Sequence, residues 1–182
     1  MLFRSLSSPF VWEINYPAMT KRTAPASLPT ANPVGVRYSP NGTYLALQIQ
    51  GSTNNLVVYS TSAMTMLTAP GTPPTGTNTA DGMLAWSPDS TVLTLATATS
   101  PFIWLYTVSG TTITKVANPV TLPEGPGVGV SFRADSAKIF FIQNPASGAF
   151  FYTFSWNGTT LSHDANPLQP PNGVAHGIAS TL

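Results

Sequence analysis

Few residues in this sequence could carry acid–base chemistry or bind a metal ion. Its 182 residues include six acidic residues, two histidines and no cysteine. The acidic residues are Glu13, Asp81, Asp89, Glu124, Asp135 and Asp164, and the histidines are His163 and His176. A paired-carboxylate site needs two carboxyl groups close together with shifted pKa values. Asp81 and Glu124 each precede a similar apolar stretch and are the candidates for such a pair, but the sequence shows neither their distance nor their pKa values.

Two other acids have a structural interpretation. Asp89 and Asp135 occupy equivalent positions in short polar segments, and Asn41 takes the same position in a third segment. Side chains of Asp and Asn accept hydrogen bonds from nearby backbone groups in tight turns. We therefore interpret these three residues as turn residues.

The histidines do not suggest a metal site, which usually needs three or four suitably spaced ligands. His163 and Asp164 are adjacent, so in a strand they point to opposite faces. His176 takes a position that aromatic residues fill elsewhere in the chain, which indicates a packed histidine. No nucleophile elbow, phosphate loop or zinc-binding helix pattern occurs. We expect no catalytic, cofactor-binding or metal-binding residues and no enzymatic activity.

Composition limits the remaining possibilities. Charged residues make up 7% of the chain and the formal net charge is +1, whereas about 25% of a typical soluble domain is charged. The length favours a single domain over 1–182. No basic stripe is present, so we expect no nucleic-acid binding. A surface this poor in charge offers little electrostatic barrier to self-association. The N-terminal residues match no secretory signal peptide, and no apolar run has the length of a membrane span.

Three copies of one pattern organise the chain, at a period typical of propellers and solenoids. Each copy has a glycine, an apolar alternation, an aromatic residue, a turn and a second apolar alternation. The glycines are Gly35, Gly82 and Gly127. The aromatic residues, 48 (86 − 38) and 46 (132 − 86) residues apart, are Tyr38, Trp86 and Phe132. A third apolar run and a weaker fourth follow each copy, and four short strands per unit are what a propeller blade requires.

The repeats contain the turns SPNG, SPDS and RADS, and the second repeat continues as WSPDSTVLTLATATSPFIWLYTV from Trp86. These segments resemble the WD-repeat, YVTN and TolB-like propeller families, although the WD and GH dipeptides are missing. The resemblance covers about three units. This resemblance, together with the number of repeats and the alignment of the two chain ends, predicts an all-β, four-bladed β-propeller of four-stranded antiparallel blades. Blades are expected at 33–78, 79–123 and 124–171, with a fourth divided between 1–32 and 172–182. Asp81 and Glu124 would then lie near one mouth of the central channel.

The two ends of the chain complete the predicted ring. PFVW from Pro9 aligns with PFIW from Pro101, so the N-terminus is expected to supply the later strands of the fourth blade. GVAHGIASTL from Gly173 aligns with the first strands of the other repeats and is expected to supply the first strand. N- and C-terminal strands sharing one blade leave no long open edge. The rival architecture is an open half-ring that pairs with a second copy, or blades shared between subunits.

For function, the low charge, the lack of cysteine and the Thr/Asn/Ser-rich surface resemble bacteriophage virion proteins. This resemblance implies a non-enzymatic structural, assembly or adhesion protein of a tail, a fibre or a capsid surface. Its location would be the virion, and its partners other virion proteins, copies of itself and a host surface glycan or protein, without membrane insertion.

Two other classes remain open. One is a soluble cytoplasmic propeller that binds a peptide or glycan at its channel mouth, where an exposed tryptophan would stack on the ligand. The tryptophans are Trp12, Trp86, Trp104 and Trp156, most of which we expect in the core. The other is a lactonase- or glycosidase-like enzyme, which the near absence of carboxylates from the channel strands disfavours.

Overall fold

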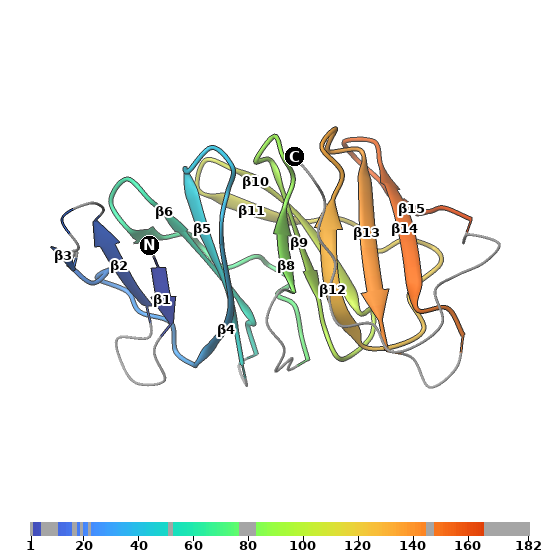
Figure 1. Ribbon diagram of the computed structural model, residues 1–182, viewed down its shortest axis with the longest axis horizontal. Coiled ribbons are helices and arrows are strands. Elements are labelled where there is room, and N and C mark those ends of the chain that lie inside the picture. The colour runs from blue at the N-terminus through green and yellow to red at the C-terminus, as the bar shows by residue number, and fades with distance from the viewer. Residues whose placement is uncertain are drawn as a thin grey trace.

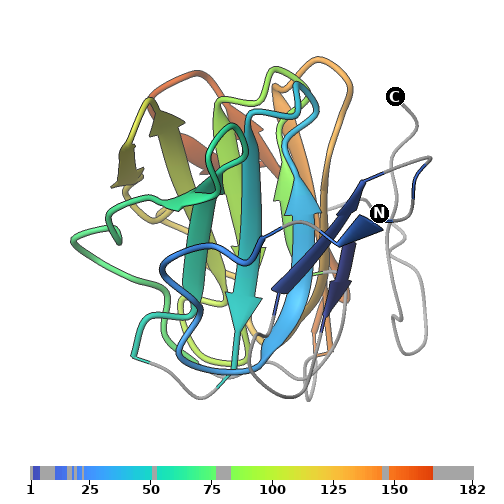
Figure 2. The same cartoon turned by 90° about the vertical axis from the view of Figure 1, so that its left-hand side faces the viewer.

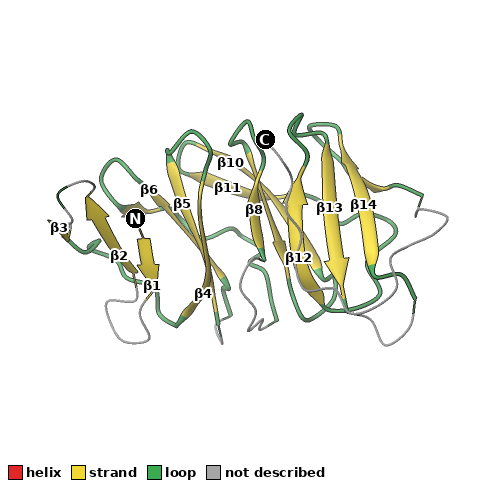
Figure 3. Cartoon of the chain, in the orientation of Figure 1, coloured by secondary structure: helices red, strands yellow, loops and turns green. Residues whose placement is uncertain are grey.

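The computed structural model describes residues 2–4, 11–15, 18, 20–21, 23–50, 53–76, 83–144 and 148–165. In this part of the chain all regular structure is β-strand, and no helix occurs (Figure 3). Accordingly, these residues form no helix able to cross a membrane. The predicted all-β class is confirmed.

The strands form four antiparallel sheets, each made of strands consecutive in the sequence (Figure 1). The N-terminal sheet contains β1 (Leu2–Arg4), β2 (Val11–Asn15) and β3 (Thr20–Lys21). Sheet I contains β4 (Pro33–Tyr38), β5 (Tyr44–Ile49), β6 (Leu56–Ser60) and β7 (Thr65–Met66). Sheet II contains β8 (Leu84–Trp86), β9 (Val92–Ala96), β10 (Ile103–Ser109) and β11 (Thr112–Lys115). Sheet III contains β12 (Gly127–Phe132), β13 (Lys138–Gln143), β14 (Phe151–Trp156) and β15 (Leu161–His163). The three predicted four-strand repeats are confirmed.

The sheets stack side by side in one row (Figures 1 and 2). Strand β1 lies against β4, β4 lies against β8, and β8 lies against β12. The N-terminal sheet stands at one end of the row and sheet III at the other (Figure 1). The described sheets therefore form an open row and no closed ring. The predicted first strand of the fourth blade, in 172–182, lies outside the described residues, so the four-bladed closure is not confirmed.

Apolar side chains fill the two seams, the packed boundaries between sheets I and II and between sheets II and III. Strands β5 and β9 are buried along their whole length, because each lies in a sheet covered on both faces. In β5, Tyr44 and Ala46 face sheet II, whereas Leu45 and Leu47 belong to a separate cluster. Burying a leucine side chain stabilises a fold by about 1.5–3 kcal/mol, so these strands anchor the row.

Serine hydroxyls connect neighbouring sheets at the turns between their first and second strands. The amide of Asn41 in sheet I donates to Ser90 Oγ in sheet II at 3.0 Å. The amide of Asp89 in sheet II donates to Ser136 Oγ in sheet III at 3.2 Å. Ser90 and Ser136 have φ values of 65° and 60°, a left-handed conformation that aims each hydroxyl at the preceding turn. The equivalent residue of sheet I is Gly42, with φ 73° and no hydroxyl.

Candidate functional site

Asp89 and Asn41 have the turn roles that their positions predict. Asp89 Oδ1 accepts hydrogen bonds from Ser87 Oγ at 2.5 Å, from the Thr91 amide at 3.1 Å and from Thr91 Oγ1 at 2.9 Å. Burial acts to raise the pKa of Asp89, but the hydrogen bonds from Ser87 and Thr91 together lower it below its ordinary value. Asn41 Oδ1 accepts from the Thr43 amide at 3.0 Å. These side chains therefore brace their own turns.

Asp135 is engaged in the same way in sheet III. Its Oδ1 accepts from the Ala137 amide at 3.0 Å, and its Oδ2 accepts from Arg133 Nε at 2.9 Å. The hydrogen bond from Arg133 is the main reason why the pKa of Asp135 is lowered to about 2. The turn interpretation of Asp135 is confirmed.

The paired-carboxylate hypothesis concerns Asp81 and Glu124. Glu124 lies beside Tyr152: burial raises the pKa of the Tyr152 hydroxyl, and the charge of Glu124 raises it further. Asp81 and His176 lie outside the described residues, while Glu13 lies in β2. The distance between Asp81 and Glu124 therefore stays untested.

His163 and Asp164 point to opposite faces of sheet III, as predicted. The His163 ring lies 5.0 Å from the ring of Tyr152 and 5.6 Å from that of Phe154, on the side that packs against sheet II. Asp164 lies on the other side, where Lys138 Nζ donates to its Oδ2 at 2.8 Å. In the described ranges no group of three or more His, Asp or Glu residues is placed to bind a metal ion.

Three tryptophans pack within the seams instead of offering a stacking surface. Trp86 is 7% exposed, Trp104 6% and Trp156 9%. Trp86 stacks on Tyr44 of sheet I, with ring centroids 5.8 Å apart. The expectation that most tryptophans are core residues is confirmed for these three, which removes their support for a glycan-stacking site at the channel mouth. Trp12 lies in β2.

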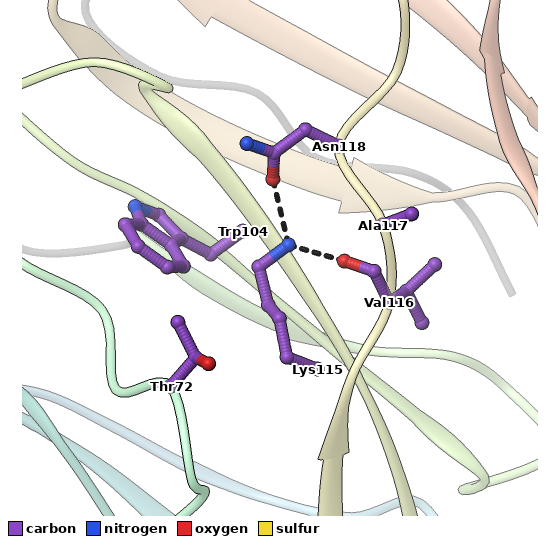
Figure 4. A pocket seen from close by; sticks show the side chains of 6 residues that line it. All are labelled: Thr72, Trp104, Lys115, Val116, Ala117 and Asn118. Atoms are coloured by element: carbon purple, nitrogen blue, oxygen red, sulfur yellow. Dashed lines mark hydrogen bonds between the residues drawn. The ribbon is translucent and has the colours of Figure 1, made fainter.

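An open hollow of about 440 Å³ lies at the outer rim of sheet II, and sequence reasoning did not find it (Figure 4). It lies between the segment after β7 and the segment that follows β11. Its lining residues are Thr72, Trp104, Lys115, Val116, Ala117 and Asn118. Lys115 Nζ lies 5.3 Å from the centroid of the Trp104 ring and donates hydrogen bonds to the Val116 carbonyl and, at 2.7 Å, to Asn118 Oδ1.

The strand register explains how this hollow forms. Lys115 pairs with Tyr106 across the β10–β11 hairpin, and Trp104 precedes Tyr106 by one side-chain repeat on the same face. A long side chain on one strand reaches such a diagonal neighbour on the next. Tyr106 in turn donates to the Thr72 carbonyl at 3.0 Å, which fixes the opposite wall. The sequence signal that could have located this hairpin is Gly110, which lies in the turn between β10 and β11.

The second unusual surface is the end face of sheet III, turned away from sheet II. Its β13 and β14 residues alternate with those that pack on sheet II, and the cross-strand pairs that place them together are Lys138 with Ser155, Phe140 with Thr153, and Ile142 with Phe151. Phe140 and Phe151 are half-buried and stack at 5.9 Å. Asp164 closes this face, because its Oδ1 accepts from Ser155 Oγ at 2.6 Å while its Oδ2 binds Lys138.

The end face differs from the equivalent faces of sheets I and II. Each second strand has an equivalent position six residues after the repeat's aromatic residue. Tyr44 and Val92 occupy it in sheets I and II, where both are buried in a seam. Lys138 occupies it in sheet III and is neutralised by Asp164. Among the described residues no further sheet lies against this face, so sheet III presents a mixed apolar and polar surface where sheets I and II are each packed against a neighbour.

No protein-family model matches the chain, and no curated protein matches its sequence. Its fold is nevertheless similar to solved structures. Hydrazine synthase from Kuenenia stuttgartiensis matches with a TM-score of 0.63 and 12% identity, over 84% of this chain and 41% of that chain. The WD40 repeats of RRP9 match with a TM-score of 0.52 and 12% identity, over 72% of this chain and 37% of that chain. TolB from Acinetobacter baumannii matches with a TM-score of 0.52 and 17% identity, over 88% of this chain and 37% of that chain.

These likenesses define the fold alone. They confirm the resemblance to WD-repeat and TolB-like propellers. The chain spans less than half the length of each of these three proteins. The molecule therefore has a propeller-like fold.

Proposed function

We propose that this chain is a non-enzymatic assembly protein whose copies complete a propeller ring by head-to-tail contact, as part of a virion. In this arrangement the end face of sheet III in one copy packs against the N-terminal sheet of the next. The observation that carries the proposal is the end face, with its stacked Phe140 and Phe151 at 5.9 Å.

The repeat itself supports the need for a neighbour. The faces of sheets I and II that correspond to the end face are covered by the next sheet along the row, as the burial of Tyr44 and Val92 shows. A row of sheets with an apolar stripe at its end is stabilised when another sheet covers that stripe. The Lys138–Asp164 pair supplies the polar rim that protein interfaces commonly have.

A second copy is the occupant that fits best. Two copies of a four-sheet row would give a ring at the upper end of the usual range of about four to eight blades. A net charge of +1 leaves little repulsion between copies.

A role without catalysis is supported by how the carboxylates are used. Asp89 and Asp135 accept hydrogen bonds within their turns, and Asp164 is paired with Lys138. The virion location is supported by the low charged fraction of 7% and the absence of cysteine. Mass spectrometry of purified particles from the source of this chain tests that location, and its absence from every particle preparation would overturn it.

The oligomeric state tests the ring. Light scattering coupled to size exclusion should give twice the chain mass of 19.2 kDa for the wild type at about 1–100 µM. Thr153→Arg places a charge in the half-buried centre of the end face and should give a monomer. Val120→Arg adds the same charge at a fully exposed apolar residue and should leave the dimer intact.

Circular dichroism and thermal unfolding of both variants establish that each is folded. A wild type that stays at 19.2 kDa throughout this range would overturn the proposal, and would favour closure of the ring within one chain. A folded Thr153→Arg variant that still forms the dimer would overturn the assignment of the end face.

A further inference from the structure

The hollow beside sheet II contains the ammonium group of Lys115, for which the described part of the chain offers no negative partner. Lys115 is half-buried, and within the described ranges no carboxylate forms an ion pair with it. Removing an ammonium group from water is costly unless an opposite charge or a set of acceptors compensates. Burial accordingly lowers the pKa of Lys115.

The compensation that Lys115 receives is partial. Its ammonium group has three N–H donors, and two of them reach the Val116 carbonyl and Asn118 Oδ1. The face of Trp104, at 5.3 Å, adds a cation–π attraction. None of these groups carries a formal negative charge, so a bound anion would gain a charge-assisted hydrogen bond from the third N–H.

The walls of the hollow carry further donors. Thr72 and Asn118 are exposed and bring a hydroxyl and an amide nitrogen to the rim. The Thr72 carbonyl is already taken by the Tyr106 hydroxyl at 3.0 Å, so the acceptor on that side is occupied. Around Lys115 (Figure 4) the remaining lining is apolar, from Val116 and Ala117.

We infer that this hollow binds a carboxylate group of a partner polypeptide, with Lys115 as the charged donor and Asn118 as a neutral donor at the rim. A carboxylate matches one ammonium group in charge and needs few donors. A phosphate at neutral pH carries about 1.5 to 2 negative charges and favours several cations or arginine pairs, which the hollow lacks. A sugar favours an exposed aromatic face, whereas Trp104 is 6% exposed and lies beneath the lysine.

The three lysines of the chain make a direct measurement practicable, because their Cε resonances can be assigned by substitution. The protein is titrated with the blocked tripeptide Ac-Gly-Glu-Gly-NH₂, whose only carboxylate is the side chain, and with Ac-Gly-Gly-Gly-OH, whose only carboxylate is the C-terminus. A saturable shift of the Lys115 Cε resonance, at about millimolar peptide, is expected with at least one of them. The peptide that binds more tightly identifies the source of the carboxylate.

Matched controls separate charge from shape. Ac-Gly-Gln-Gly-NH₂ has the same size without the charge and should bind at least about tenfold more weakly than its Glu counterpart if the side chain is the source. Lys115→Met keeps an aliphatic stem against Trp104 and should abolish saturable binding of both acidic peptides, as read from the Trp104 indole resonance. Lys115→Arg should retain binding, and Lys138→Met, which removes a lysine from the end face, should bind as the wild type does.

The outcomes are decisive because binding is followed on a folded chain. Absence of a saturable shift with either acidic peptide up to about 50 mM would overturn the inference. Equal binding of the Glu and Gln peptides, with no binding of the C-terminal carboxylate, would overturn the assignment of a carboxylate ligand. Asn118→Ala, at the exposed rim, should weaken binding about threefold to tenfold without changing thermal stability. This inference does not depend on ring formation, since the hollow and the end face lie on different sheets.

Discussion

Replacing Gly127 with alanine should loosen the seam between sheets II and III. Gly127 begins β12, and its amide donates to the Thr97 carbonyl of sheet II at 3.0 Å. A Cβ atom at this position would lie 2.6 Å from Ala96 Cβ and 2.7 Å from Phe141 Cζ, and both of these residues are fully buried. Carbon atoms in contact normally stand about 3.5–4.0 Å apart, so β12 or the Phe141 ring must move by about 1 Å.

Overpacking a filled core costs about 1–3 kcal/mol, which lowers Tm by about 2–12 °C for a chain of this size. Gly35 in β4, the first strand of sheet I, is the control glycine, because a Cβ there would meet nothing closer than Leu84 Cδ1 at 3.5 Å. Gly35→Ala should leave Tm unchanged or raise it, since alanine restricts the unfolded chain. Thermal and urea unfolding measure both variants. Equal losses of stability for the two substitutions, or no loss for Gly127→Ala, would show that the packing around Gly127 is no tighter than the packing around Gly35.

Three further predictions concern single polar groups. Ser90→Ala should cost about 1 kcal/mol in urea unfolding, because it removes the hydroxyl that accepts from the Asn41 amide; an unchanged midpoint would show that this bond contributes nothing. Asp89→Asn should be less stable than the wild type at neutral pH and equally stable in acid. The pKa of Asp89 is lowered in the folded state. Its carboxylate therefore stabilises the fold at pH values above the unfolded-state pKa of about 4, and this stabilisation is lost as the pH falls through the folded-state pKa. A stability difference between the variant and the wild type that persists in acid would contradict this. Tyr59 should ionise only at a pH of about 12, since burial raises its pKa, and its hydroxyl donates to the Ser27 carbonyl at 2.8 Å; loss of a tyrosinate signal near pH 10 in Tyr59→Phe would argue against it.

The repeat was legible in the sequence because its signals are local. The glycine, the aromatic residue and the turn recur at Gly35, Tyr38 and Asn41 and in the two later copies. Turn residues and alternation of apolar side chains depend on near neighbours in the chain. The three four-strand repeats and the turn roles of Asp89 and Asp135 could therefore be predicted from the residues alone.

The candidate site could not be predicted from the sequence, because it depends on the register of paired strands and on residues that are distant in the sequence. Lys115 contacts Trp104 because β10 pairs with β11. Thr72, on the opposite wall, lies in the segment that follows β7 of sheet I. Likewise, nothing in the sequence around Lys138 marks it as unusual. Its role becomes clear only from the folded sheets, where it takes the position that Tyr44 and Val92 occupy in sheets I and II. Closure of the ring depends on the angle between neighbouring sheets, which no single residue type specifies.

The serine links between turns have a consequence for how the repeats can be rearranged. Each link runs from the amide of the earlier turn to the hydroxyl of the later one, as from Asn41 to Ser90, so the row has a polarity. A circular permutation that placed sheet I directly after sheet III would bring the Asp135 amide to Gly42, which has no hydroxyl to offer. Gly42 already has a φ of 73°, close to the 65° of Ser90, so a serine there could restore the link. A permuted or duplicated chain would need that substitution for every pair of neighbouring repeats to form the same serine hydrogen bond.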